Sequence, residues 1–218
     1  YYLSGGFYNE DGLFRNDPAL NYNTSTFYRR FNFRANVNVT LTEHTDVDLS
    51  LATTFEQKNQ GGTDATAIWS AALRTPGVLF PMQYSNGQPS GPSANGENPY
   101  SLLTQTGYRQ SFWNNAQSVV AINHDFSWFL EGLKGTVKGS FDANNSHTQN
   151  RTRTPAIYGN AYRDGDGVLH TTQFVEGSQT LGFSRGSTGW RALYLEANLN
   201  FARSFGKHGI TAMLLYQM

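Results

Sequence analysis

Apolar and polar residues alternate along residues 27–41, FYRRFNFRANVNVTL, over an unusual length. The odd-numbered positions are apolar or small, with the single exception of Arg29, and the even-numbered positions are nearly all polar. A period of two residues predicts a β-strand with one apolar face and one polar face. Strands of globular proteins usually run about five or six residues. A two-faced strand of this length therefore needs an environment that differs on its two sides along its whole length.

The same alternation recurs at residues 47–56, 120–128, 133–142 and 193–202. Period two over these lengths indicates strands and argues against helices. We therefore predict seven strands, at residues 1–8, 26–41, 46–58, 114–129, 132–146, 189–204 and 209–218.

The connections between these strands alternate strictly between long and short. The short ones are residues 42–45, 129–132 and 205–208, and the long ones are residues 9–25, 59–113 and 147–188. An antiparallel meander would place all short turns at one end and all long loops at the other. That asymmetry is typical of outer-membrane barrels, which have short periplasmic turns, long extracellular loops and an apolar band about 25 Å tall. We therefore expect an all-β, antiparallel transmembrane β-barrel segment, with residues 59–113 and 147–188 as extracellular loops.

Three features at the ends of the strands agree with this interpretation. Arg29 interrupts the apolar face near the long-loop end, where a cation facing lipid costs only about 0–1 kcal/mol. Aromatic residues adjoin the short turns, as in the aromatic girdle of a membrane interface; they are Trp128, Phe129 and Phe205. His124 falls at the same end, and we assign it to this girdle.

Composition narrows the functional classes. Among the 218 residues, 16 are Lys or Arg and 16 are Asp or Glu, so the formal net charge is zero, which argues against nucleic-acid binding. There is no cysteine, so disulfides and thiolate metal sites are excluded. The mean hydropathy is −0.51, as expected of a barrel with a polar lumen. Bacterial single-chain barrels have an even number of strands, so we expect residues 1–218 to be part of one larger barrel domain.

Four segments, in this order, resemble SusC/RagA-type TonB-dependent outer-membrane transporters. They are FYNEDGLFRN (7–16), the stretch from Arg74-Thr75-Pro76 through residues 78–81 to Asn86-Gly87, NPYSLLTQTGY (98–108) and LEANLNFARSFGKHGITAMLLY (195–216). The resemblance covers most of the chain, and residues 149–188 carry the least of it, as expected of a variable extracellular loop.

The resemblance implies a barrel of about 22 strands with an N-terminal plug, energised through the TonB complex. The plug, the TonB box and the remaining strands would lie outside this chain. A SusD-like surface lipoprotein would cover the mouth, and the family often pairs as two transporters with two lids. The implied function is import of large nutrients, oligosaccharide in preference to peptide, across the outer membrane of Bacteroidota. The polar face of the strands suits a plug interface or a substrate channel, and we favour the plug for most of it.

Aromatic residues of the longest loop are candidates for contact with substrate or lid, because aromatic faces stack on sugar rings and long loops carry function. They are Trp69, Phe80, Tyr84, Tyr100, Tyr108 and Trp113. The alternative that we favour is packing within the loop itself. Residues 64–73, DATAIWSAAL, predict a short helix that ends at Arg74-Thr75-Pro76, and we expect Trp69 on its buried side.

No motif indicates catalysis or a cofactor. Residues 164–167, Asp-Gly-Asp-Gly, invite a calcium interpretation but lack the spacing and closing Glu of an EF-hand loop, so we favour a hairpin turn. The five histidines have no metal-ligand spacing, and no local motif suggests a Ser/His/Asp triad. We therefore predict no catalytic, cofactor-binding or metal-binding residues, and no enzyme activity.

Two soluble proteins remain as alternatives: a secreted β-rich carbohydrate-binding domain and a secreted glycoside hydrolase. In either case the apolar faces would pack against another protein layer. In a barrel wall they would face lipid. The residues that best discriminate the two are Leu193, Leu195, Leu199 and Phe201.

Overall fold

A computed structural model describes residues 1–14, 16–92 and 97–218. Within these residues it contains nine strands and two short helices. In chain order they are β1 (Tyr2–Asp11), β2 (Phe27–Thr42), β3 (Thr45–Gly61), α1 (Ala65–Arg74), α2 (Pro99–Thr104), β4 (Gly107–Asp125), β5 (Leu133–Thr152), β6 (Ile157–Arg163), β7 (Leu169–Val175), β8 (Ser184–Phe205) and β9 (His208–Gln217). Residue 15 of the 7–16 segment lies outside the described residues.

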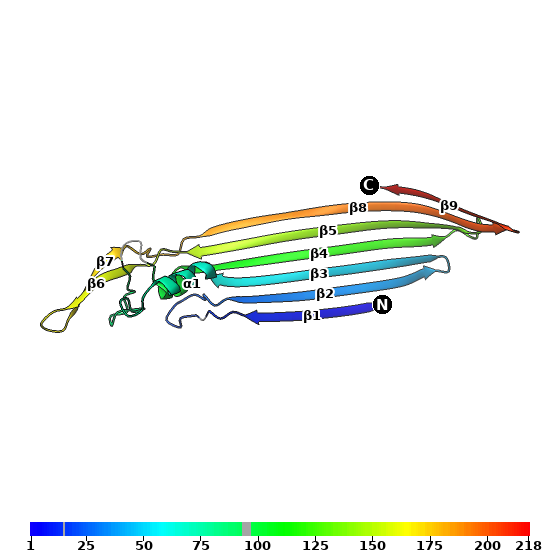
Figure 1. Ribbon diagram of the computed structural model, residues 1–218. Coiled ribbons are helices and arrows are strands. Elements are labelled where there is room, and N and C mark those ends of the chain that lie inside the picture. Colours follow the sequence, from blue (N-terminus) through cyan, green and yellow to red (C-terminus); the bar gives the residue numbers. More distant parts are fainter. Residues whose placement is uncertain (15, 93–96) are drawn as a thin grey trace.

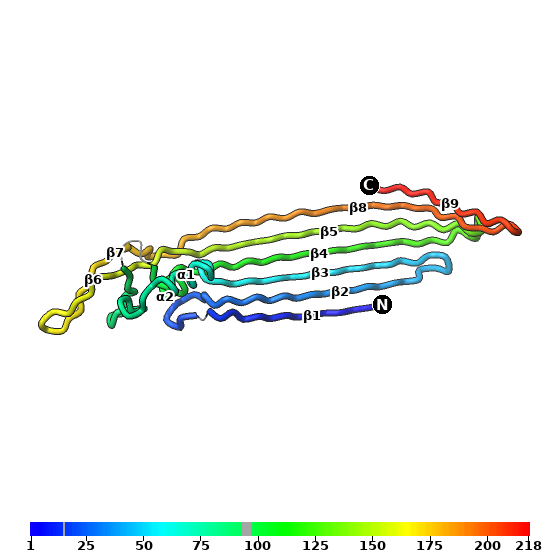
Figure 2. Tube along the Cα trace, viewed as in Figure 1, coloured from blue at the N-terminus to red at the C-terminus, as the bar shows by residue number. Residues whose placement is uncertain are grey.

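Seven of the strands form one antiparallel sheet in the order β1-β2-β3-β4-β5-β8-β9, and β6 and β7 form a separate hairpin. Figure 1 shows the sheet as a single long layer, with α1 and the hairpin at one end and the short turns at the other. The tube in Figure 2 follows the same meander, strand after neighbouring strand. The predicted seven-stranded antiparallel sheet and the segregation of long and short connections are confirmed.

The strand bounds differ from the prediction mainly at the loop end. The ladder between β4 and β5 runs from Gly107 opposite Thr152 to Asp125 opposite Lys134, so β4 begins earlier and β5 ends later than the alternation indicated. At the other end, the predicted strand containing Trp128 stops at Asp125. The Asp125 carboxylate accepts a hydrogen bond from the Ser127 amide at 2.8 Å and starts a turn instead.

The pairing register aligns apolar residues of neighbouring strands in rows that cross the sheet. One cross-strand row on the apolar face consists of Val39, Val47, Ile122, Val137, Ala197 and Tyr216. Among the described residues, the only buried hydrophobic side chains are Ile68, Ala71 and Ile157. All three lie outside the sheet, in its three long connections, whose described residues fall within 12–26, 62–106 and 153–183. We call these connections the loop layer. Leu193, by contrast, is 80% exposed. The described part of the chain therefore leaves its apolar face uncovered.

Aromatic rings border this apolar face at both ends. At the loop end they form a row across five strands, with centroids 4.9 to 6.4 Å apart: Phe7, Phe31, Phe55, Phe112 and His147. At the short-turn end, the His124 ring lies edge-on to Phe126 at 4.4 Å and its Nδ1 is 2.8 Å from the Thr45 hydroxyl. His124 lies where it was predicted. The row at the loop end was not foreseen.

The predicted loop helix is confirmed as α1, which ends at Arg74 before Thr75 and Pro76. The expected burial of Trp69 is wrong. Ile68 and Ala71, three residues apart on one face, are the buried side chains of α1, and Trp69 points away from that face and is 54% exposed. Helix α2 was not predicted. Its start could be read from Asn98-Pro99, since Asn is a common N-cap and Pro a common first residue.

Candidate functional site

A row of aromatic, charged and hydroxyl side chains crosses the polar face of the sheet near the loop end. Register aligns one residue from each of six neighbouring strands: Tyr8, Arg30, Glu56, Trp113, Ser146 and Thr188. The Arg30 guanidinium lies 5.8 Å from the centre of the Tyr8 ring. Trp113 is half-buried and stands between Glu56 and Ser146. The row thus combines a cation, a carboxylate and a half-buried indole.

The adjoining row on the same face consists mainly of carboxamides and ends in a second indole. Its members are Asn32, Thr54, Asn115, Asn144 and Trp190. The Trp190 side chain is 59% exposed. Neighbouring strands lie about 4.8 Å apart, so Trp113 on β4 and Trp190 on β8 stand on strands roughly 10 Å apart. We call these two rows the indole–amide surface: Arg30, Asn32, Thr54, Glu56, Trp113, Asn115, Asn144 and Trp190.

The chemistry of the indole–amide surface suits a polar ligand with flat apolar faces. A hollow of about 360 Å³ adjoins most of it. Indoles stack on such faces, and carboxamides both donate and accept hydrogen bonds. Within the described residues, no group of three or more His, Asp or Glu side chains could hold a metal ion.

The polar face near the short turns is different, because its side chains already bond to one another. Asp48 accepts from Asn38 Nδ2 at 2.7 Å and from Asn123 Nδ2 at 2.8 Å. The Thr136 hydroxyl donates to Asn123 Oδ1 at 2.9 Å. This chain of bonds crosses β2, β3, β4 and β5. These four side chains are already bonded to one another, and the stretch suits a fixed protein interface.

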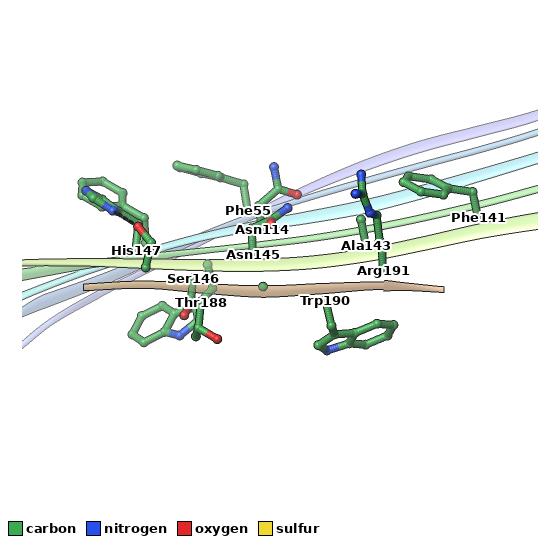
Figure 3. A pocket seen from close by; sticks show the side chains of 14 residues that line it. Phe55, Asn114, Phe141, Ala143, Asn145, Ser146, His147, Thr188, Trp190 and Arg191 are labelled. Carbon is green, nitrogen blue, oxygen red and sulfur yellow. Dashed lines mark hydrogen bonds between the residues drawn. The ribbon is translucent and has the colours of Figure 1, made fainter. Parts of the chain in front are cut away.

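The hollow lined by Phe55, Arg191 and Trp190 is not a single site, because the sheet passes through it. Figure 3 shows Phe55, Asn145 and Arg191 on one side of the sheet, with Thr188 and Trp190 on the other. Side chains on opposite faces cannot converge on one ligand. Its two halves therefore belong to different surfaces, and the half with Trp190 is part of the indole–amide surface.

The aromatic residues predicted as contacts do not gather at one place. Only Trp113 lies on the polar face of the sheet. Three of the others contact the segment between β1 and β2. These pairs are Trp69 with Phe14, at 6.0 Å between ring centroids, Tyr108 with Tyr22, also at 6.0 Å, and Tyr100 with Asp17. They tie two connections of the loop layer together. Trp190 was missed because it falls within the predicted strand 189–204, whereas the candidate contacts were taken from the longest loop.

The Tyr100–Asp17 contact is a hydrogen bond from the phenol to the carboxylate. This bond holds the pKa of Asp17 below its ordinary value. Burial, and then the same bond, raises the pKa of Tyr100.

The remaining two predicted aromatic residues lie within the longest connection. The Tyr84 carbonyl accepts a hydrogen bond from the Gly87 amide at 2.9 Å and closes a turn. Phe80 is half-buried, and its amide donates to Pro76 O at 3.1 Å.

The Asn98 side chain connects separate segments of the loop layer through hydrogen bonds. Its side-chain NH₂ donates to the carbonyls of Met82 and Ser90, each at 2.8 Å. Its side-chain oxygen accepts from the amides of Tyr100 at 2.9 Å and Ser101 at 3.2 Å, which caps α2. Asn98 is 3% exposed. One buried carboxamide therefore fixes both the start of α2 and the path of residues 82–90.

The hairpin of β6 and β7 belongs to the connection between β5 and β8, and hydrogen bonds join it to the connection between β3 and β4. The Tyr158 amide donates to Pro89 O, and Tyr158 O accepts from the Gly91 amide, both at 2.9 Å. The Thr171 hydroxyl donates to Gln88 Oε1 at 2.7 Å. The loop layer is thus continuous across residues that are far apart in the sequence.

The predicted hairpin turn at residues 164–167 is confirmed. The Gly167 amide donates to Asp164 O at 3.0 Å, and Gly167 has a φ of +79°. The Asp164 carboxylate accepts from the Val168 amide at 2.9 Å and lies 2.7 Å from His170 Nε2. Its oxygens therefore serve the hairpin itself.

Comparison with models of known protein families finds none that matches this chain, and comparison with curated proteins finds no match either. Neither α1 nor α2 is long and apolar enough to cross a membrane.

We predict that Asn98→Asp separates the two roles of Asn98. The carboxylate can still cap α2, but it cannot donate to Met82 and Ser90, whose carbonyls lose a partner at a cost of about 1–3 kcal/mol each. Hydrogen exchange should therefore accelerate at residues 82–91 and change little within α2. Asn98→Ala is the matched control and should accelerate exchange in both segments. Equal protection of both segments in Asn98→Asp would contradict this role.

We predict that acid loosens the hairpin. The His170 hydrogen bond, and then the Val168 amide, holds the pKa of Asp164 below its ordinary value near 3.8. Since the folded pKa is lowered, the carboxylate contributes stability that is fully present above the ordinary value and is lost as the pH falls through the lowered pKa. Hydrogen exchange in β6 and β7, corrected for its intrinsic pH dependence, should rise below about pH 4. Asp164→Asn should abolish that rise, and a rise that persists in this variant would contradict the assignment.

Proposed function

We propose that this chain forms part of the wall of an outer-membrane β-barrel, in a SusC-like TonB-dependent transporter that imports oligosaccharides. One observation carries the proposal. The seven-stranded antiparallel sheet has an uncovered apolar face bordered by aromatic rings at both ends, and all its long connections lie at one end. This is the arrangement that a bilayer requires of a barrel wall.

The dimensions fit a bilayer. From Phe112 to His124, the two aromatic borders of β4, the strand rises roughly 40 Å at about 3.3 Å per residue. A tilt of about 45° reduces this to roughly 28 Å, close to the hydrocarbon thickness of about 25–30 Å. Backbone groups in lipid must also bond internally, which the unbroken ladder between β4 and β5 provides.

A secreted carbohydrate-binding domain is less well supported. It would need a second layer over the apolar face, and the described residues supply none. Its strands would also be short, because strands of globular proteins seldom exceed about ten residues. Here β5 has 20 residues and β8 has 22.

The proposed partners follow from the two ends of the sheet and from the resemblance. The joined loop layer would face outward, under a SusD-like surface lipoprotein. The hydrogen-bonded part of the polar face near the short turns would contact the plug, through which the TonB complex acts. Pairing of two transporters with two lids belongs to the same proposal.

Oligosaccharide is the cargo that the indole–amide surface fits best. It offers a row of carboxamides and two indoles, Trp190 exposed and Trp113 half-buried, which can stack on sugar rings.

We predict that Trp113→Ala and Trp190→Ala each lower oligosaccharide uptake about tenfold, because loss of one stacking contact of this kind is worth about 1–1.5 kcal/mol. The measurement is the initial rate of uptake of labelled oligosaccharides by energised cells, with and without TonB. Trp128→Ala, in a short turn, is the matched control and should leave uptake unchanged. Uptake that is independent of TonB, or equal in all three variants, would contradict the proposal.

We predict that Leu51→Arg and Ser50→Arg differ sharply, although these residues are neighbours on β3. Leu51 lies mid-strand on the apolar face, where an Arg facing lipid costs about 2–4 kcal/mol. Ser50 lies on the polar face, where the same change should cost less than about 1 kcal/mol. The measurement is the free energy of folding of the whole protein into lipid vesicles. Equal costs for both variants would argue for two solvated faces and against a bilayer.

A further inference from the structure

Arginines are divided unevenly between the two faces of the sheet. By strand alternation and register, the apolar face of the seven strands carries five arginines and a single carboxylate, Asp11. The five are Arg29, Arg151, Arg185, Arg191 and Arg203. All lysines within these strands lie on the polar face instead. The apolar face is therefore cationic near its ends as well as apolar between them.

The arginine nearest the short turns is neutralised by the chain itself. Arg203 Nη2 lies 2.7 Å from the Glu131 carboxylate, and its guanidinium lies 5.0 Å from the centre of the Phe205 ring. At the loop end of the apolar face, the one carboxylate within the seven strands is Asp11 on β1, and among the described residues it forms no ion pair with an arginine. Arg191 has no hydrogen bond, ion pair or aromatic ring as a partner among residues 1–14, 16–92 and 97–218.

Arg191 stands at the border between the apolar and the polar part of its face. It pairs with Ala143, and the next pair of that face toward the short turns is Phe141 with Leu193. The next pair toward the loops is Asn145 with Gly189, where the Asn145 carboxamide lies over the glycine: a Cβ on Gly189 would come 2.5 Å from Asn145 Oδ1.

Small residues and polar side chains thus form a hollow beside the cation. Ala143 and Gly189 form its floor, and Figure 3 shows Arg191, Asn145, Asn114 and His147 projecting on the same side of the sheet. His147 Nδ1 is 2.8 Å from the Ser187 hydroxyl.

We propose that this hollow binds the phosphate of a lipid headgroup from the outer leaflet. The proposal rests on the barrel-wall function. Arg191 shares a cross-strand row with Ala143 and Ala116, a short way inside the aromatic row that contains Phe112, and its long side chain can reach the headgroups from there. The planar guanidinium pairs with phosphate through two parallel hydrogen bonds. The Asn145 carboxamide supplies a further donor, and acyl chains lie along Phe141 and Leu193. We call these residues the headgroup site: Asn114, Phe141, Ala143, Asn145, Gly189, Arg191 and Leu193.

Charge complementarity favours this occupant. A guanidinium at a lipid boundary without its own carboxylate attracts anions, and headgroup phosphates are the anions present near that depth. The contrast with Arg203 supports this, because the arginine at the opposite border of the same face carries its own counter-ion.

The test uses the whole protein in nanodiscs of phosphatidylcholine that contain a small fraction of lipid A with two phosphates. Native mass spectrometry counts the lipid A molecules retained after delipidation. Arg191→Gln should lower retention about tenfold, since a charge-assisted hydrogen bond is lost, and Arg191→Lys should restore part of it. Arg203→Gln is the matched control on the same face and should not change lipid A retention.

Each other outcome has a definite meaning. Equal retention by Arg191→Gln and the unaltered protein would overturn the headgroup site. Equal retention of lipid A and its dephosphorylated form would overturn the role of phosphate. Displacement of lipid A by inorganic phosphate alone would show an anion site without lipid selectivity, and would also overturn it. Failure of the protein to enter nanodiscs would instead contradict the barrel-wall function itself, so the two proposals fail separately.

Discussion

An unbroken antiparallel hydrogen-bond ladder is the constraint on which the rest of this structure depends. Between β4 and β5 it pairs every residue from Gly107 to Asp125 without a register shift. Side chains of one strand alternate between the two faces, so a shift of one residue would move every apolar group to the polar face. The continuity of the ladder is therefore what keeps the apolar face, its aromatic borders and the indole–amide surface separate over the length of the sheet.

Sheet and loop layer are stabilised by different chemistry. The sheet buries almost no side chains of its own, and within the described residues its apolar groups stay uncovered. The loop layer is held by small buried polar residues, among them Thr24, Ser90 and Asn98, and by Asn59 near the end of β3. The Asn59 side-chain NH₂ donates to the carbonyls of Asn23 at 3.1 Å and Ser25 at 2.7 Å. Such bonds are directional, so they fix the path of irregular backbone where no apolar core is available. A layer of this kind can hold long connections in place above a wide polar face.

Sequence reasoning captured what depends on neighbouring residues. The strands, the alternation of long and short connections, α1 and the turn at residues 164–167 all have local signals. What it missed depends on register between distant segments. The aromatic row from Phe7 to His147 arises only when five strands are aligned, and Phe55 and Phe112 are separated by the longest connection. Trp190 gained its place beside the carboxamides in the same way. Trp69 was misplaced because its large apolar ring suggested burial, whereas the smaller Ile68 and Ala71 face the loop layer.

In a barrel wall the apolar face of the sheet lies against lipid, and spin-label accessibility measures this orientation. These 218 residues contain no cysteine, so single cysteine replacements at positions 116–123 of β4 can be labelled one at a time in the reconstituted protein. The account predicts a period of two residues. Even-numbered positions should be accessible to oxygen dissolved in the bilayer, and odd-numbered positions to a water-soluble nickel complex. Even-numbered positions that are accessible to the nickel complex, or to neither reagent, would show water or a protein layer against the apolar face and would contradict the account.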